Sequence, residues 1–382
     1  MSTTRHLPHL DQLARDLVVV PRVAPAASVA LALRRASGWE CFVGAAGQHS
    51  VQDARPATAA LVFDLASVSK PFVALALARL AARGRIGWED RLDLHLDEAS
   101  GTATAAMPLE LLLAHRAGLL PHLELFAPMR ERRSMHRSAA LHEAASARRS
   151  ECGGRVPPDG FPPAYSDLGY ILVGEAMSRT LGLPLDQIVR GEVCEPLGLT
   201  AGSARQWRAD DPDFMRHVAP TEHTTWRGGE LVGVAHDDNA WALVGHGLAG
   251  HAGLFADAAA VARMGAAVLD ALEGRVTHWL SPDALEPVLR QRAGGSLRAG
   301  FDGKSGPDSA AGRRCSQRTF GHLGFTGTSV WCDPDAGEIS VLLTNRVNPT
   351  RHHMAIRAAR PRVHDALRTA AAEAQQLAGG TS

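Results

Sequence analysis

Lysine is almost missing from this chain of 382 residues, which has 38 arginines and only two lysines, Lys70 and Lys304. Neither sign of charge is in excess, because 40 basic residues balance 40 acidic ones and the formal net charge is zero. Proteins that bind nucleic acids or anionic membranes do so through an excess of positive charge. The composition therefore gives no support for either kind of partner.

Long hydrophobic runs are also absent. The longest, such as PFVALALARLAA at 71–82, is shorter than the ~20 residues that cross a bilayer. The first twenty residues contain charges at Arg5, Asp11, Arg15 and Asp16 and no apolar core, so we expect no signal peptide. Five cysteines without a CxxC pair are typical of reduced thiols. We therefore expect a soluble, cytoplasmic, globular protein.

Both ends of the chain have the pattern of β-hairpins. The runs ASVALALRR and WECFVGAAG, at 27–35 and 39–47, are rich in strand-forming residues and are separated by a short turn. Residues 326–346 repeat this form, with the turn Asp-Pro-Asp-Ala-Gly at 333–337. The middle of the chain is rich in Ala and Leu and reads as helical, and we predict a last helix from about residue 352 to 376.

This order of elements predicts an α+β fold. We expect an antiparallel sheet flanked by N- and C-terminal helices, with a mostly helical inserted lobe. The corresponding segments are 1–95 and 285–382 for the two parts of the α/β lobe, and 96–284 for the helical lobe with its functional loops. Together they are expected to form one two-lobed unit. The Gly- and Ser-rich stretch at 294–312 predicts a mobile surface loop.

Lys70 lies in the apolar stretch DLASVSKPFVALALARLAARG, residues 64–84. A helix that is apolar nearly all round is usually buried. Pro71 must lie in the first turn of such a helix, so the helix begins close to Ser67, and Gly84 is a natural stop. Ser67 and Lys70 are then neighbours on one helix face, with Cβ atoms roughly 5–6 Å apart.

This pair can be a nucleophile and its base. A serine hydroxyl needs a base to take its proton. An ammonium in an apolar pocket loses solvation, which lowers its pKa and makes the neutral amine accessible, whereas arginine stays protonated. A purely structural interpretation is also open: Ser67 caps the helix and Lys70 extends to solvent.

Tyrosine is as rare as lysine, with only Tyr165 and Tyr170. Tyr165 follows the Pro-rich run VPPDGFPPA and precedes a predicted helix, a junction where functional side chains are commonly presented. Tyr170 lies within LGYILVGEAM and is expected to pack in the core. Further on, FGHLGFTGTSVW places His322 and Gly324 at the opening of a predicted strand, where glycine allows a ligand to approach the backbone.

These stretches, in this order, resemble the serine β-lactamase and penicillin-binding-protein superfamily, in particular its class C-like members. The family's motifs are S-x-x-K, then Y-x-N or S-D-N, then K-T-G. Here they correspond to SVSK at 67–70, YSD at 165–167 and HLG at 322–324. Supporting stretches such as LLLAHRAGLLPH (111–122) and GLAGHAGLFADAAAVARM (247–264) extend the resemblance over most of the chain. It implies a β-lactamase/transpeptidase-like fold.

The resemblance also implies roles for individual residues. Ser67 would be the acylated nucleophile, Lys70 its base, and Tyr165 the group that relays a proton to the leaving group. The backbone N–H groups of Ser67 and Phe325 would form the oxyanion hole. Asp167, His322 and Gly324 would contact substrate, with His322 in the place of the third-motif lysine.

Two residues depart from the family pattern. Asp167 replaces an asparagine and removes an amide donor toward substrate. His322 replaces a lysine and supplies a weaker, pH-dependent positive charge. Both changes leave the acylation residues in place and speak against efficient β-lactam turnover.

A histidine-rich segment contains His236, Asp237, Asp238, His246 and His251 within sixteen residues. These residue types can bind a metal, but their spacing fits no named motif. We therefore predict no metal site and expect His236 and His251 to hydrogen-bond loops near the cleft.

Other functional classes are weaker. SVSK also resembles the Schiff-base segment of pyridoxal-phosphate enzymes, with Lys70 holding the cofactor, although that lysine usually lies past mid-chain. No G-x-S-x-G of an α/β-hydrolase occurs. GKS at 303–305 lacks the earlier glycine of a P-loop, so Lys304 is expected to be solvated. The basic run MRERRSMHR, 129–137, is expected to be an exposed helix face.

The hypothesis from the sequence is a serine hydrolase that acts through a covalent acyl-enzyme on a small ester, amide or β-lactam carbonyl, without metal or organic cofactor. Esterase or D-alanyl peptidase activity is preferred over efficient β-lactamase activity. The alternative is a binding or sensing module of the same fold that deacylates slowly or not at all. The expected partner is a small-molecule substrate, and the sequence leaves the oligomeric state open.

Overall fold

The fold is taken from a computed structural model, which describes residues 4–275 and 278–379. Its longest strands belong to one large sheet. The strands are β1 Thr4–His6, β2 Ala26–Arg35, β3 Gly38–Gly47, β4 Phe63–Asp64, β5 Ala201–Ser203, β6 His223–Thr224, β7 Gly229–Glu230, β8 Leu254–Ala256, β9 Asp302–Gly303, β10 Phe320–Leu323, β11 Ser329–Asp333 and β12 Glu338–Thr344.

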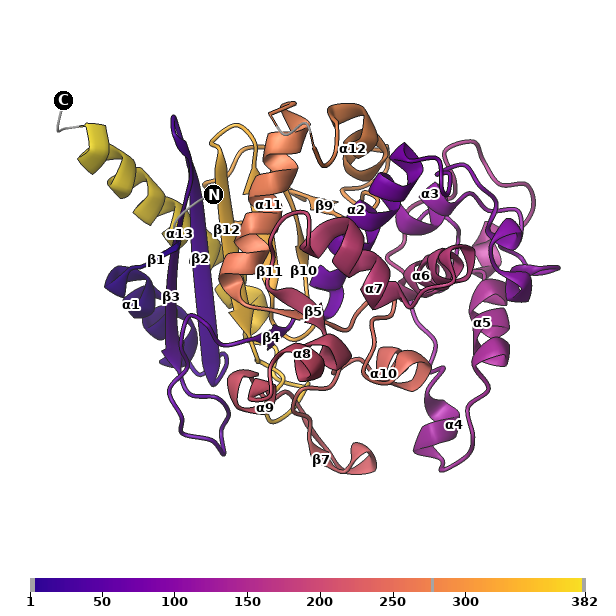
Figure 1. The fold of residues 1–382 in the computed structure, drawn as a ribbon, viewed down its shortest axis with the longest axis horizontal. Coiled ribbons are helices and arrows are strands. Elements are labelled where there is room, and N and C mark those ends of the chain that lie inside the picture. The colour runs from indigo at the N-terminus through magenta and orange to yellow at the C-terminus, as the bar shows by residue number, and fades with distance from the viewer. Residues whose placement is uncertain (1–3, 276–277, 380–382) are drawn as a thin grey trace.

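The helices occupy the ends and most of the middle of the chain. They are α1 Pro8–Ala14, α2 Ser69–Ala82, α3 Leu109–Leu113, α4 Ala127–Arg130, α5 Arg137–Ser146, α6 Asp167–Leu181, α7 Leu185–Val189, α8 Ala204–Asp210, α9 Phe214–His217, α10 Asp238–Val244, α11 Ala258–Leu272, α12 Pro282–Leu289 and α13 Ile356–Gly379. Figure 1 shows the large sheet at the left and the helical lobe at the right.

The two ends of the chain build the large sheet together. Its seven strands have the order β1-β3-β2-β12-β11-β10-β9, so the predicted N-terminal hairpin β2–β3 and C-terminal hairpin β11–β12 are both confirmed. They join through the antiparallel pair β2–β12, with Val29 opposite Leu342. Only β1 pairs in parallel among the described strands of this sheet. The predicted α+β fold with an antiparallel sheet is thus confirmed.

Both faces of the sheet are covered by helices (Figure 1). α1 and α13 pack on one face, where Leu10 and Val363 belong to one buried apolar cluster with Val29 and Leu342. α11 packs on the other face against β2, β11 and β12. Alternate residues along β2 therefore meet apolar layers on both sides, which explains why eight successive residues of that strand are buried.

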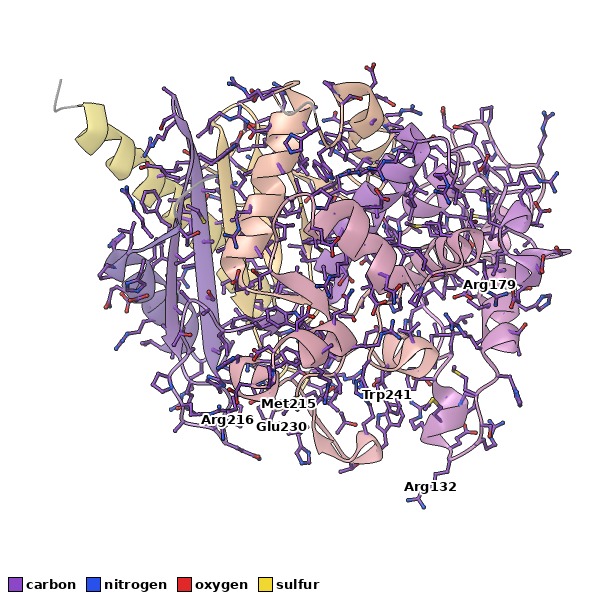
Figure 2. The ribbon with its side chains drawn as sticks, in the orientation of Figure 1. Arg132, Arg179, Met215, Arg216, Glu230 and Trp241 are labelled. Atoms are coloured by element: carbon purple, nitrogen blue, oxygen red, sulfur yellow. The ribbon has the colours of Figure 1, made fainter. Side chains whose placement is uncertain are left out.

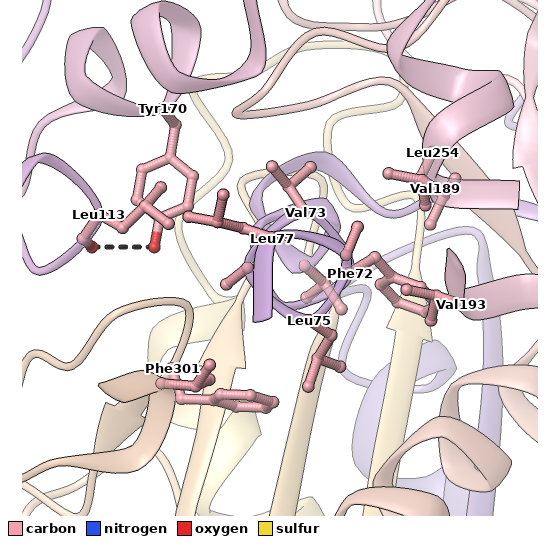
Figure 3. Packing of buried hydrophobic residues seen from close by; sticks show 14 of the residues in the cluster. Phe72, Val73, Leu75, Leu77, Leu113, Tyr170, Val189, Val193, Leu254 and Phe301 are labelled. Carbon is pink, nitrogen blue, oxygen red and sulfur yellow. Dashed lines mark hydrogen bonds between the residues drawn. The ribbon is translucent and has the colours of Figure 1, made fainter. Parts of the chain in front are cut away.

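Helix α2 lies in the core of the molecule, as its all-round apolar sequence predicts. Every residue from Ser69 to Leu80 is buried. Figure 3 shows Phe72, Val73 and Leu77 packed among side chains from several other segments, with the Tyr170 hydroxyl donating to the carbonyl of Leu113. Tyr170 is fully buried, as expected.

Several local expectations are wrong. The last helix begins at Ile356, four residues later than predicted, because residues 345–355 form a loop beside the site. The stretch 294–312 is not a mobile surface loop, since Ala299 and Phe301 are buried and Asp302–Gly303 joins the sheet. Lys304 is half-buried and donates to the carbonyl of Cys315.

The basic run at 129–137 is exposed, but it is not a helix face. It links the end of α4 to the first residue of α5, and Arg132 extends away from the molecule below α4 (Figure 2). Within the described ranges, no helix combines the length and hydropathy that crossing a bilayer requires. The division of the chain at residues 95 and 284 stays a prediction.

The contact between Gly250 and α6 brings the segment before β8 against the helical lobe. A Cβ on Gly250 would lie 1.7 Å from the carbonyl oxygen of Tyr170, and a Cβ on Gly174 would lie 2.8 Å from the Cα of Gly250. Only glycine at both positions allows this backbone approach, which also sets the position of the next residue, His251.

We expect Gly250→Ala to lower the free energy of unfolding by about 3 kcal/mol, because the new methyl group must push α6 and the segment apart. Urea denaturation measures this loss. Gly191→Ala is the matched control, since a Cβ there meets nothing within 4 Å and Gly191 has no positive φ. Equal stability of the two variants would contradict the close packing.

Candidate active site

Ser67 lies in a 3₁₀ turn, Ala66–Val68, that leads directly into α2. The turn begins with a strained residue, because Ala66 has a φ of 47°. The carboxylate of Asp64 holds this conformation, since it accepts hydrogen bonds from the N–H of Ala66 at 2.8 Å and of His236 at 2.6 Å. The serine is thereby presented at a fixed corner between β4 and α2.

Lys70 is 0% exposed and does not extend to solvent, so the structural interpretation of this lysine fails. Its ammonium donates to three acceptors from three parts of the chain: Ser67 Oγ at 2.9 Å, Asp167 Oδ1 at 2.7 Å and the carbonyl of His251 at 3.2 Å. The predicted neighbourhood of Ser67 and Lys70 is confirmed. Asp167, at the first position of α6, is brought to the same point from about a hundred residues away.

The protonation of Lys70 differs from the expectation. Burial lowers the pKa of Lys70, as the apolar sequence indicated, but the charge and the hydrogen bond of Asp167 raise it above the ordinary value. Burial likewise raises the pKa of Asp167, and Lys70 brings it below the ordinary value. The pair is therefore an ammonium and a carboxylate at neutral pH.

Tyr165 lies over this ion pair, with its ring centroid 5.0 Å from Lys70 Nζ. Burial raises the pKa of Tyr165, against the opposing effect of Lys70, so the phenol is neutral. His115 stacks on the ring at 4.6 Å, and its Nδ1 accepts the N–H of Ser166 at 3.0 Å. Burial, together with the Lys70 charge, lowers the pKa of His115 to about 3, so a neutral imidazole fixes the tyrosine.

The turn between β10 and β11 brings Phe325 to the cavity that Ser67 also lines. Thr328 Oγ1 donates to the carbonyl of Leu65, and Thr326 Oγ1 donates to that of Asp64, so the turn is tied to the residues that precede the serine. Neither the Ser67 nor the Phe325 N–H meets an acceptor elsewhere in the described chain. Free N–H donors in a cavity beside a nucleophile are able to bind an oxyanion.

Gly324 is required for a different reason from the predicted one. It lies just after the end of β10 and does not open a strand. A Cβ on Gly324 would lie 1.9 Å from Thr328 Oγ1 and 2.5 Å from the carbonyl of Leu65. The glycine thus permits the close contact between the turn and the Ser67 segment.

His322 does not occupy the position expected of a substrate-binding cation. It is 4% exposed, its Nδ1–H donates to the carbonyl of Leu323, and its ring faces Tyr165 at 6.1 Å. Burial and the charge of Lys70 lower the pKa of His322 to about 3. It is neutral at working pH, and its ring lies beside that of Tyr165.

Ser67 opens into a cavity of about 570 Å³. Tyr165, Asp167, Gly324 and Phe325 also line it, so the structure brings these predicted residues together. The cavity is further lined by His122, Glu124, His236, Asp237, Asp238, Arg346, Arg351, Arg357 and Arg360.

Three of the cavity arginines have no carboxylate partner within the residues that the structure describes: Arg346, Arg357 and Arg360. Arg346 is 2% exposed and donates to carbonyls such as that of Phe325. Arg360 is 8% exposed and donates to the carbonyls of Gly324 and Thr328, while its buried Nε has no partner. Burial, with Arg346 and Arg357 adding to it, lowers the pKa of Arg360 to about 9.

The histidine-rich segment supports the cavity wall. The backbone N–H of His236 donates to the Asp64 carboxylate, and the ring Nε2 of His236 lies 3.0 Å from the Glu222 carboxylate. The ring Nε2 of His251 lies 2.7 Å from the Asp237 carboxylate. His236 and His251 therefore form hydrogen bonds near the cleft, as expected. His246 is exposed. In the described ranges, no group of three or more His, Cys, Asp or Glu is placed to hold a metal.

Sequence reasoning missed Asp64, His115 and the unpaired arginines. His115 lies in the stretch LLLAHRAGLLPH, which supported the family resemblance but did not mark His115 as a functional residue. The arginines could not be distinguished among 38, because their lack of partners becomes visible only in the fold.

A family model described as Beta-lactamase matches residues 18–363. The chain belongs to the beta-lactamase family. A putative D-alanyl-D-alanine carboxypeptidase of Escherichia coli (strain K12) is 25% identical over 316 residues, which is 76% of this chain and 70% of that protein. An N-acetylmuramyl-L-alanine amidase of Bacillus subtilis (strain 168) is 25% identical over 313 residues, 75% of this chain and 68% of the relative.

Solved structures share the fold of this chain. EstCE1, a hydrolase with promiscuous acyltransferase activity, has a TM-score of 0.67 at 20% identity, covering 92% of this chain and 97% of its own. A penicillin-binding protein homologue from Caulobacter crescentus has a TM-score of 0.65 at 18% identity, covering 94% and 98%. The beta-lactamase/transpeptidase-like fold and the assignment to its serine hydrolases are thus confirmed, which leaves no support for a pyridoxal-phosphate enzyme.

Gly324→Ala is expected to lower kcat/KM about 100-fold for any ester that the enzyme turns over, because the methyl group displaces the Phe325 N–H from the Ser67 N–H. Steady-state kinetics at matched thermal stability measure this loss. Gly153→Ala is the control, since a Cβ there has its nearest contact at 3.9 Å. Unchanged kinetics in the folded Gly324 variant would exclude the Phe325 N–H from the reaction.

Proposed function

We propose that this protein is a serine hydrolase that forms a covalent acyl-enzyme on Ser67. The observation that carries the proposal is the contact of Ser67 Oγ with the Lys70 ammonium at 2.9 Å, with the Tyr165 ring over that ammonium, in a cavity that Phe325 also lines. Ser67 Oγ attacks an ester or amide carbonyl, whose oxygen becomes negative between the N–H groups of Ser67 and Phe325. Tyr165 gives a proton to the leaving group, and water then releases the acyl group.

The preferred substrate is an ester or amide that carries a carboxylate, as the end of a D-alanyl peptide does. Arg346, Arg357 and Arg360 support this preference, because they leave positive charge without a partner in the same cavity as Ser67. The names of the relatives, a putative D-alanyl-D-alanine carboxypeptidase and an amidase, agree with such a substrate. Asp167 in place of asparagine supports peptidase or esterase activity over efficient β-lactamase activity.

A fluorophosphonate probe should form one adduct on the wild-type protein and none on Ser67→Ala, as measured by intact mass. Lys70→Arg should also form none, because a guanidinium has no accessible neutral form that can take a proton. Turnover of small esters should be lost in both variants.

Two results would count against this function. An adduct on folded Ser67→Ala would place the nucleophile elsewhere, and a reactive Lys70→Arg would remove the base role. A stable acyl adduct on the wild type without product release would favour the alternative function of a sensing module that deacylates slowly.

The arginines predict a preference for an anionic substrate. For 3-acetoxybenzoate, kcat/KM should exceed that for its uncharged methyl ester, and Arg357→Gln should reduce this ratio about five- to tenfold, since a charge-assisted contact is removed. Arg362→Gln is the matched control, because Arg362 is exposed on the same helix and does not line the cavity.

The preference for an anionic ligand can also be measured by binding alone, without turnover. Ser67→Ala should bind 3-hydroxybenzoate more tightly than methyl 3-hydroxybenzoate in calorimetry. Equal binding of the two, or equal effects of the Arg357 and Arg362 changes, would show that the unpaired arginines do not recognise the substrate.

A further inference from the structure

The ion pair between Lys70 and Asp167 leaves the resting site without a free base at the serine. An ammonium has three donors and no lone pair. All three donors of Lys70 are engaged, with Ser67 Oγ at 2.9 Å, Asp167 Oδ1 at 2.7 Å and the His251 carbonyl at 3.2 Å. Lys70 therefore has to lose one of its own protons before it can accept the proton of Ser67.

Of these three partners, only Asp167 can receive that proton. Ser67 is the group that must lose a proton itself, and a backbone carbonyl is too weakly basic to hold one. Solvent does not reach the amine, because Lys70 is 0% exposed. Asp167 has 19% of its side chain exposed and lines the cavity, so a substrate that fills the cavity takes water away from its carboxylate.

We propose that Asp167 accepts a proton from Lys70. It is a positioning residue, which leaves Lys70 as a neutral amine for each acylation. This inference rests on the proposed function of Ser67. When substrate displaces water, a proton passes from Lys70 Nζ to Asp167 Oδ1, and two charges become a neutral amine and a neutral acid. A neutral pair is favoured over an ion pair when both groups lose solvation.

The remaining steps return every proton. The amine takes the proton of Ser67 while the Oγ–carbon bond forms. Tyr165 protonates the leaving oxygen or nitrogen as its bond to carbon breaks. The ammonium of Lys70 then reprotonates Tyr165, and Asp167 returns its proton to Lys70. The serine proton ends on the leaving group, and the ion pair is restored.

Several other titratable groups face the pair. His115 and His322 are neutral, because burial and the Lys70 charge lower the pKa of each to about 3. Asp237 at the start of α10 stays ionised, because His251 lowers its pKa against the effect of burial. The full set around Lys70 and Asp167 comprises His115, His122, Tyr165, Asp237, His251 and His322, with His122 Nδ1 4.0 Å from Asp167 Oδ2.

The pH dependence of Ser67 labelling by the fluorophosphonate probe tests this role. In the wild type the transferable proton stays within the pair, so the rate constant should be flat between pH 5 and 8. In Asp167→Asn, Lys70 must lose its proton to solvent, so the rate should rise with pH, at tenfold per pH unit below the pKa that Lys70 has in the variant. The ratio of the wild-type labelling rate to the variant labelling rate should therefore be larger at pH 5 than at pH 9.

Three further variants separate this role from a structural one. Asp167→Glu keeps a carboxylate and should keep the flat profile. Asp270→Asn removes a carboxylate of similar exposure on α11, paired with Arg34, and should follow the wild type. The labelling rate of His122→Gln should also be independent of pH between 5 and 8, which shows that the exposed imidazole does not set the pH dependence.

Parallel profiles for the wild type and Asp167→Asn would overturn the inference. So would a wild-type rate that rises tenfold per pH unit from pH 5 to 8, a result that needs no variant to fold. If the wild type forms no adduct at any pH, the proposed function itself fails. An adduct with parallel profiles would remove only the proton-accepting role of Asp167.

Discussion

The site depends on the burial of one ammonium. Lys70 is inaccessible to water, and a buried charge is stable only when every donor has an acceptor. The acceptors come from the 3₁₀ turn before α2, the first residue of α6 and the carbonyl of His251. Each of these segments is held for its own reason: Asp64 fixes the turn, His115 binds the start of α6, and Gly250 lets the backbone approach that helix. Removing any one of them leaves one donor of the buried ammonium without an acceptor.

The large sheet positions the other part of the site, the turn between β10 and β11 that contains Phe325, against the segment before Ser67. β2 and β12 join the two ends of the chain, and β11 follows from that pairing. The turn between β10 and β11 is thereby brought against Leu65, where Thr326 and Thr328 tie it to the strand before Ser67. Ser67 and Phe325 are thus positioned by segments some 260 residues apart, so the geometry of the candidate oxyanion site is a property of the whole fold.

The sequence predicted what local chemistry determines. The helix after Ser67, the spacing to Lys70 and the two hairpins follow from periodicity, proline and turn residues, and the structure confirms them. The pKa of Lys70 was predicted in the wrong direction, because the apolar sequence shows the desolvation but not the carboxylate that α6 delivers from residue 167. His322 was expected to be a cation for a similar reason: its burial behind Tyr165 is set by tertiary packing, which a motif position does not reveal.

The two departures from the family motifs act together on the charge around Ser67. The usual pattern combines the S-x-x-K lysine with a neutral asparagine and a second lysine. Here Asp167 adds a negative charge and His322 is neutral, so the surroundings of the serine are more negative by two charges than in that pattern. Positive charge is found instead on the loop after β12 and on α13, at Arg346, Arg357 and Arg360. Arg346 and Arg360 are buried without a carboxylate partner, which is costly, and an anionic group of a substrate would relieve that cost. The chain therefore separates the charge that sets the protonation of Lys70 from the charge available for substrate, two tasks that the usual motifs place close together.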